Sequence, residues 1–226
     1  MILTVTAGKG GVGKSTVAYN LAAELDAVVI DADLGMADLP TSRGPDLHDV
    51  LAGRASPTEA VREDGPVKLL PCGRSLAGAR AADSTALVET VQDVASKYDR
   101  VVIDSPAGMR SDAGLPLLAG DACLVVTIPT QAAISDAIRI RELARVIETP
   151  LVRVALNRVE PDRLARSVRN ERLATTLGAP VVPIPESPVL AQAQQSGQPV
   201  RTVAPVARAT RQFETLATAV ESALSA

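Results

Sequence analysis

The sequence is poor in aromatic residues, with two tyrosines, one phenylalanine and no tryptophan among its 226 residues. Proteins that bind single-stranded nucleic acids stack the bases on aromatic side chains, so this scarcity disfavours a base-stacking function. Positive charge is not in excess either, since 23 Lys and Arg stand against 26 Asp and Glu, a net charge of −3. A domain that binds nucleic acid over its whole surface is generally basic, and we do not expect one here.

Cysteine and histidine are also rare. Cys72 and Cys123 form no C-x-x-C pair or metal-ligand cluster. We expect both to be small buried side chains in a reducing compartment. The single histidine, His48, is expected at a surface position of a helix, and no Ser–His–Asp arrangement can be built around it.

Long apolar runs are missing, and none reaches the length that crosses a bilayer. The first run, Ile2–Ala7, also lacks the basic leader of a signal peptide. We therefore expect a cytoplasmic protein. The length suits one domain, residues 1–226, that buries its core without disulfides or metals.

Short runs rich in Val, Ile and Leu predict buried parallel strands. These runs are Ile2–Ala7, Ala27–Asp31, Val67–Pro71, Arg100–Asp104, Ala122–Ile128, Val152–Leu156 and Val181–Ile184. Helical patterns cover Lys14–Leu25, Thr85–Lys97, Ser135–Ile147, Arg163–Leu177 and Val206–Leu224. This alternation predicts a single-domain α/β fold with a mostly parallel twisted sheet that helices cover on both faces. Two segments rich in Pro, Gly and charge, Leu39–Gly65 and Pro183–Pro205, are expected at the surface.

The strongest functional signal matches the phosphate-binding pattern G-x-x-x-x-G-K-[ST]. It consists of Gly8, Lys9, Gly10, Gly11, Val12, Gly13, Lys14, Ser15 and Thr16. A strand precedes it and a helix follows, which is the context the motif requires. The glycines let backbone N–H groups face phosphate oxygens, and the helix N-terminus adds positive potential. We predict that Lys14 binds the β- and γ-phosphates, Ser15 binds Mg²⁺ and Thr16 donates to the α-phosphate.

Three aspartates stand at or just after the ends of predicted strands, and the carboxyl ends of parallel strands form the ligand crevice of an open sheet. We therefore expect Asp31, Asp33 and Asp104 beside the phosphate loop. Mg²⁺ takes oxygen ligands and keeps several waters, so Asp104 is assigned to Mg²⁺ through water. Asp33 is assigned to positioning the attacking water. Asp31 either belongs to the outer shell of the metal or caps the following turn.

The segment Lys9–Ser15 resembles the deviant Walker A motif of the MinD/ParA family of P-loop ATPases, and the likeness extends over nearly the whole chain. Asp31–Gly35 is similar to the family's first switch, and Asp104–Gly108 to the MinD version of its second. The resemblance implies that Lys9 reaches the partner's nucleotide in an ATP-dependent homodimer, as an arginine finger does elsewhere. The alternative is a solvated charge on the loop. The run Met36–Asp38 departs from MinD, where a basic residue and then an asparagine usually follow, so we expect slower or differently regulated hydrolysis.

Other residues are predicted to contact the base and the γ-phosphate. The resemblance implies that Asn157 reads adenine, which suits an amide because it offers both a donor and an acceptor. It also implies that a loop containing Pro183, Pro185 and Glu186 contacts the base through its backbone. A polar turn and a proline-fixed turn are the alternatives for these two features. Gly108 is predicted to offer its N–H to the γ-phosphate. Because the guanine-selective Asn-Lys-x-Asp motif is absent, we expect ATP rather than GTP.

Two further patterns bear on partners. Arg163, Arg166, Arg169 and Arg172 recur every three residues, just downstream of Arg158. They form either an anion-binding ridge or, as we favour, a solvated helix face balanced by acidic neighbours. The last helical pattern has a polar side of mixed charge, whereas a membrane-surface helix is basic. We expect it to dock on the sheet, and we find no basic amphipathic tail like that of MinD proteins.

Together these features predict a weakly hydrolysing Mg²⁺·ATPase that switches between a monomer and an ATP-sandwich dimer. By resemblance its output is spatial positioning of a division site, DNA or surface machinery, with an unidentified activator or cargo protein. It would be cytoplasmic or peripheral at a membrane or nucleoid, although neither its charge nor its C-terminal helix supports binding to lipid or DNA. The alternatives are a metabolic ligase or cofactor-assembly ATPase, and a nucleotide-sensing module with little turnover.

Overall fold

The structure is a computed structural model that describes residues 1–35, 39, 43–73, 75–108, 114–160, 162 and 167–225, without the side chains of 76 and 167–169. Its centre is a seven-stranded sheet in the order β3-β2-β4-β1-β5-β6-β7, in which every neighbouring pair is parallel. The strands are β1 (Ile2–Thr6), β2 (Val28–Asp31), β3 (Leu69–Leu70), β4 (Val101–Asp104), β5 (Ala122–Thr127), β6 (Leu151–Val159) and β7 (Val181–Pro185). The predicted parallel α/β sheet is therefore confirmed.

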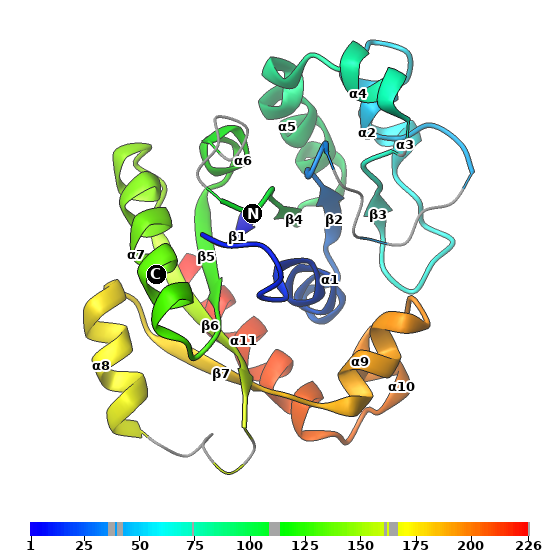
Figure 1. Cartoon of the computed structure of the whole chain (residues 1–226). Helices are drawn as coiled ribbons and strands as arrows, with labels where there is room; N and C mark the ends of the chain where they lie inside the picture. Colours follow the sequence, from blue (N-terminus) through cyan, green and yellow to red (C-terminus); the bar gives the residue numbers. More distant parts are fainter. Residues whose placement is uncertain are drawn as a thin grey trace.

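Helices cover both faces of the sheet (Figure 1). One face carries α1 (Lys14–Leu25), α9 (Pro188–Gln195), α10 (Val200–Val203) and α11 (Arg208–Leu224). The other face carries α2 (Leu47–Leu51), α3 (Pro57–Ala60), α5 (Leu87–Tyr98), α6 (Gly114–Ala119), α7 (Gln131–Val146) and α8 (Ser167–Leu177). Near α2 lie α4 (Leu76–Ala81) and a 3₁₀ turn, η1 (Ser84–Ala86), which leads into α5. None of the helices in the described ranges is long and apolar enough to cross a bilayer.

The core is divided by the sheet into two sides, because successive side chains of a strand point to opposite faces. In β4, Val102 packs in the cluster beneath α1 and α11, whereas Val101 and Ile103 pack with α5. All three side chains are fully buried. Burial on both faces explains why these strands appear in the sequence as continuous apolar runs rather than as alternating patterns.

The expectation that Leu39–Gly65 lies at the surface is wrong for part of the segment. It contains α2 and α3, and Leu47 and Leu51 are buried against α5 and the sheet. Asp46 and Asp49 form a capping box at the start of α2. The polar residues therefore mark helix caps, which sequence composition alone does not separate from exposed loop. Pro183–Pro205 likewise contains β7, α9 and α10, in which Ala193 and Val200 are fully buried.

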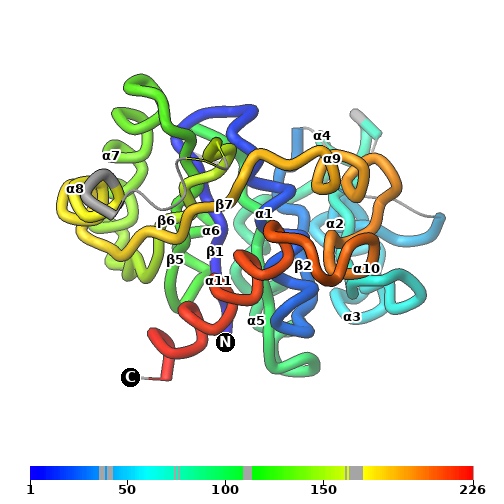
Figure 2. The backbone as a smooth tube through the Cα atoms, turned by 90° about the horizontal axis from the view of Figure 1, so that it is seen from below, coloured from blue at the N-terminus to red at the C-terminus, as the bar shows by residue number. Residues whose placement is uncertain are grey.

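The last helix docks on the sheet, as expected. Figure 2 shows α11 running beside α1 beneath β6 and β7. Its apolar side includes Phe213, Leu216 and Val220, all fully buried. Val206, expected on this buried side, precedes the helix and is 80% exposed.

We expect Phe213→Ala to lower the free energy of unfolding by about 3–5 kcal/mol, because truncating a buried phenylalanine removes its packing and leaves a cavity. The matched control is Val206→Ala, since Val206 is 80% exposed and should leave stability unchanged within about 0.5 kcal/mol. Chemical denaturation of both variants measures the difference. A similar small loss in both would show that α11 does not pack on the sheet as described.

Candidate functional site

The glycine-rich loop joins β1, the middle strand of the sheet, to the N-terminus of α1. Two of its glycines are required by close contacts. A Cβ on Gly13, which has φ of 90°, would collide with the side-chain amide of Asn157. A Cβ on Gly8 would collide with the backbone carbonyl of Asp136 in α7. The opposite surface of the loop is open, because a Cβ on Gly10 or Gly11 would meet nothing within 4 Å.

Beside the loop, Lys14 and Asp104 form a buried ion pair, with 2.6 Å between Nζ and Oδ1. Lys14 is 5% exposed and Asp104 is fully buried. Asp104 ends β4, and the register of β2 against β4 places Asp31 directly beside it. Lys14 Nζ also lies 3.3 Å from the Ser15 hydroxyl. The predicted approach of these residues to the phosphate loop is therefore present in the structure.

Asp31 makes the turn-capping contacts that the sequence offered as one alternative, and its place in the outer shell of a metal stays a prediction. It accepts backbone N–H bonds from Asp33 at 3.3 Å and from Leu39 at 3.4 Å, so it caps the turn after β2. Burial, followed by the charge of Asp104, raises the pKa of Asp31 to about 7. Two carboxylates thus lie next to one lysine, and this excess of negative charge is what a cation site needs.

A cavity of about 470 Å³ opens over the loop. Asp33 and Gly35 line one part of it, after β2, and Pro106 and Ala107 line another, after β4. The full lining is Lys9, Gly10, Gly11, Gly13, Lys14, Ser15, Thr16, Asp33, Gly35, Pro106, Ala107, Arg158 and Gln194. Lys9 is exposed, in contrast to the buried Lys14. The cavity therefore combines backbone N–H groups, a helix N-terminus, lysines, hydroxyls and a carboxylate, which is the donor set for a metal-bound polyphosphate.

Asn157 supports the loop from below. Its side chain is 4% exposed, and Nδ2 donates to Val12 O at 2.9 Å. It is not among the residues that line the cavity. Its reading of adenine stays a prediction, and its observed partner is the loop itself.

Residues 3–200 match the family described as the CobQ/CobB/MinD/ParA nucleotide binding domain. The chain belongs to the MinD/ParA family. An uncharacterised ATP-binding protein of Methanocaldococcus jannaschii is 36% identical over 197 residues, which cover 82% of this chain and 74% of that protein. The MinD/ParA proteins are P-loop ATPases, and this chain shares their loop.

Solved MinD structures have the same fold. The cell division ATPase MinD of Pyrococcus furiosus superposes with a TM-score of 0.87 at 30% identity, over 98% of both chains. The septum site-determining protein MinD of Pyrococcus horikoshii, complexed with Mg-ADP, gives 0.86 at 29% identity, over 97% of this chain and 95% of that one. MinD of Aquifex aeolicus, in a complex with MinC, gives 0.81 at 26% identity, over 98% and 96%.

The base-side loop expected from the MinD/ParA resemblance is a strand. Pro183 and Pro185 belong to β7, which pairs with β6. Proline is tolerated there because β7 is an edge strand with no further partner in the described sheet. Glu186 follows the strand, is exposed, and donates its N–H to Val159 O at 2.9 Å. Contact with a base through this segment stays a prediction.

The second switch of this MinD/ParA chain is described as far as Gly108. Its N–H donates to Ala7 O at 2.9 Å, so the predicted contact with a γ-phosphate requires this bond to be exchanged. The departure from MinD at Met36–Asp38 lies outside the described residues. Arg163 and Arg166 of the expected basic ridge lie outside them as well, as does the side chain of Arg169.

Two residues that line the cavity, Arg158 and Gln194, lie outside the phosphate loop and the two switch segments that the sequence predicts. Arg158 has a positive φ of 53° and follows Asn157 where the pairing of β6 and β7 shifts register. Such bulges re-aim side chains near active sites, but the sequence shows only an arginine near the expected ridge. Gln194 of α9 accepts a hydrogen bond from the Thr16 hydroxyl at 2.9 Å. No local pattern indicates this contact, which joins residues 178 positions apart.

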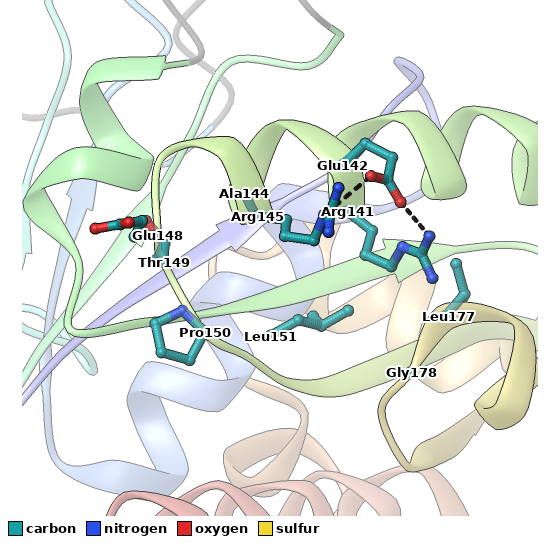
Figure 3. Close-up of a pocket in the computed structure, with 10 residues that line it drawn as sticks. All are labelled: Arg141, Glu142, Ala144, Arg145, Glu148, Thr149, Pro150, Leu151, Leu177 and Gly178. Carbon is teal, nitrogen blue, oxygen red and sulfur yellow. Dashed lines mark hydrogen bonds and ion pairs between the residues drawn. The ribbon is translucent and has the colours of Figure 1, made fainter.

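A larger cavity, of about 710 Å³, lies near the opposite edge of the sheet, where α7 and α8 end and β6 begins (Figure 3). Arg141 and Arg145 both pair with Glu142 there. Helix C-termini carry partial negative charge and disfavour phosphate. The smaller cavity over the loop is therefore the candidate nucleotide site of this MinD/ParA chain.

We expect Asn157→Ala to weaken binding of both ATP and inorganic tripolyphosphate roughly three- to tenfold, the size of one lost hydrogen bond. The reason is that Asn157 holds the loop that contacts phosphate, whatever it does for the base. Titration calorimetry with the two ligands measures this, with thermal unfolding as the check on folding. A loss confined to ATP would show that Asn157 acts only on the adenine.

Proposed function

We propose that this protein is a Mg²⁺·ATP-dependent switch that forms a dimer around two nucleotides and hydrolyses them slowly. The observation that carries the proposal is the contrast between the two lysines of the loop. Lys14 is buried and lies within the reach of its own phosphate site. Lys9 is exposed at the rim of the same cavity, where a charge is accessible to a second molecule.

The cavity fits a nucleoside triphosphate with magnesium. Its open surface at Gly10 and Gly11 leaves room for phosphates against the backbone. Ser15, with Asp104 and Asp31 as carboxylates close by, would hold the metal. Among the described residues no group of three or more His, Cys, Asp and Glu side chains could hold a metal alone, and Mg²⁺ characteristically takes few protein ligands together with phosphates and water. When bound, Mg²⁺ neutralises charge on the phosphate oxygens.

The chain's own residues have separate roles in this proposal. When the nucleotide binds, Lys14 exchanges its ion pair with Asp104 for an ion pair with a phosphate group. Asp33, which lines the cavity, orients the attacking water. Gly108 exchanges its bond to Ala7 for one that senses the γ-phosphate. Lys9 completes the site of the partner subunit, so that ATP favours the dimer over the monomer.

The output proposed is spatial positioning, as the names of the MinD relatives suggest, with an activator or cargo protein still to be identified. Neither a membrane nor DNA is favoured as the surface, since the net charge is −3 and the apolar side of α11 is buried on the sheet. The cytoplasmic location stays a prediction.

We expect Asp33→Ala to be dimeric with Mg²⁺ and ATP and monomeric with ADP, because hydrolysis no longer resets the switch. Adding Lys9→Ala to this variant should keep it monomeric with ATP while ATP still binds. The matched control is Lys97→Ala in the same background, since Lys97 is an exposed lysine on α5 outside the cavity. Light scattering measures the mass, and calorimetry measures ATP binding.

Three outcomes would contradict the proposal. Failure of the wild type to bind ATP would remove the nucleotide switch altogether. A monomeric Asp33→Ala with ATP bound would favour the nucleotide-sensing module. An ATP-bound dimer that persists after Lys9→Ala would show that Lys9 is only a solvated charge.

A further inference from the structure

A buried cysteine and a buried histidine contact the backbone that carries Asp33. Cys72 lies just after β3 and is fully buried, and its Sγ lies 3.1 Å from the carbonyl oxygen of Asp33. His48 of α2 is 3% exposed, and its Nε2 lies 3.2 Å from the carbonyl oxygen of Leu34. The expected surface position of His48 is therefore wrong. Two consecutive carbonyl groups are bound from inside the protein, on a segment whose Asp33 lines the nucleotide cavity.

The donors can be assigned because a carbonyl oxygen only accepts. Nε2 of His48 therefore carries a proton and donates to Leu34 O, and the Cys72 thiol donates to Asp33 O. Burial, together with the carboxylates of Asp31, Asp33 and Asp46, raises the pKa of Cys72 well above its ordinary value, so the thiol keeps its proton. Sγ of Cys72 and Nε2 of His48 are 3.6 Å apart, so the two side chains also contact each other.

The surrounding backbone is arranged to hold this pair. The first N–H groups of α2 bond back to the chain after β3: Leu47 N donates to Pro71 O at 2.8 Å, and His48 N donates to Cys72 O at 3.2 Å. A Cβ on Gly73 would come within 2.7 Å of His48 Nδ1, and one on Gly78 within 3.1 Å. Two glycines therefore make room for the imidazole, and two backbone hydrogen bonds tie the start of α2 to the residues that follow β3.

We propose that Cys72 and His48 are positioning residues that set the conformation of Asp33–Gly35, and thereby hold Asp33 in place for ATP hydrolysis. The inference rests on the proposed ATPase function. Both carbonyl groups are bound on the side of α2 and β3, which leaves the Asp33 side chain to the cavity. Losing either donor frees one carbonyl and lets the segment adopt other conformations, so the reacting geometry is populated less often. Nucleotide binding by the loop of α1 is unaffected.

The chain offers a matched control for Cys72. Cys123 of β5 is also fully buried, and its Sγ faces a backbone carbonyl, that of Thr149, at 3.9 Å. It is not among the residues that line the nucleotide cavity. Cys72→Ala and Cys123→Ala therefore remove the same group from comparable surroundings, and only the first removes a contact to the Asp33 segment.

The test is the kinetics of ATP hydrolysis by these variants. Cys72→Ala should lower kcat roughly three- to tenfold, the effect of one lost hydrogen bond, with KM for ATP unchanged. Cys123→Ala should leave both constants unchanged, and Cys72→Ser, which keeps a donor, should restore kcat. His48→Gln keeps an amide donor near the position of Nε2, so it should retain more activity than His48→Leu. Thermal unfolding of every variant tests whether the losses of kcat follow losses of stability, and we expect that they do not.

A second readout does not depend on turnover. Amide hydrogen exchange of Asp33–Gly35 should be faster in Cys72→Ala than in Cys123→Ala, while exchange in α1 stays the same. Equal kcat values and equal exchange in the two alanine variants would overturn the proposal. A wild type that neither binds nor hydrolyses ATP would instead overturn the proposed function. Faster exchange at Asp33–Gly35 in Cys72→Ala would still show that the contact sets this segment.

Discussion

The buried pair of Lys14 and Asp104 is the interaction around which the site is arranged. A buried charge is stable only when it is paired and hydrogen-bonded, and these two charges lie 2.6 Å apart in a nearly inaccessible position. Lys14 comes from the start of α1 and Asp104 from the end of β4. Their contact therefore joins the phosphate loop to the end of β4, which lies next to β1 in the sheet. Asp31 adds a second carboxylate, whose raised pKa of about 7 reflects its burial and this shared charge.

Buried side chains that do not line the cavity also hold the site in place. Asn157 holds Val12 from beneath the loop, and the Cys72–His48 contact holds Asp33 and Leu34 from beneath the first switch. These supporting groups are buried, whereas Lys9 is exposed. The phosphate-binding residues are thus held in place by buried neighbours, as preorganised binding sites require. Lys9, at the rim, is instead accessible to another molecule.

The segment from α2 to α4 gains a role from this arrangement. MinD relatives share the sheet and the loop over nearly the whole chain, and α2 lies away from the loop (Figure 1). Through His48 and Cys72, α2 and the end of β3 contact the residues next to Asp33. A packed core has discrete arrangements rather than a continuous range. These contacts thus link the position of α2 to that of the segment that carries Asp33.

The sequence by itself determined the sheet, the phosphate loop and the family, because these depend on local patterns: apolar runs, helical spacing and glycines at set intervals. The meeting of Lys14, Asp31 and Asp104 also followed, since parallel strands end at one edge. Only the tertiary structure placed Asn157 beneath the loop, turned Arg158 into the cavity and buried His48 beside Cys72. Those contacts join residues far apart in the chain, and they depend on a bulge, on helix caps and on the packing of α2 against β3, none of which has a repeating pattern in the sequence.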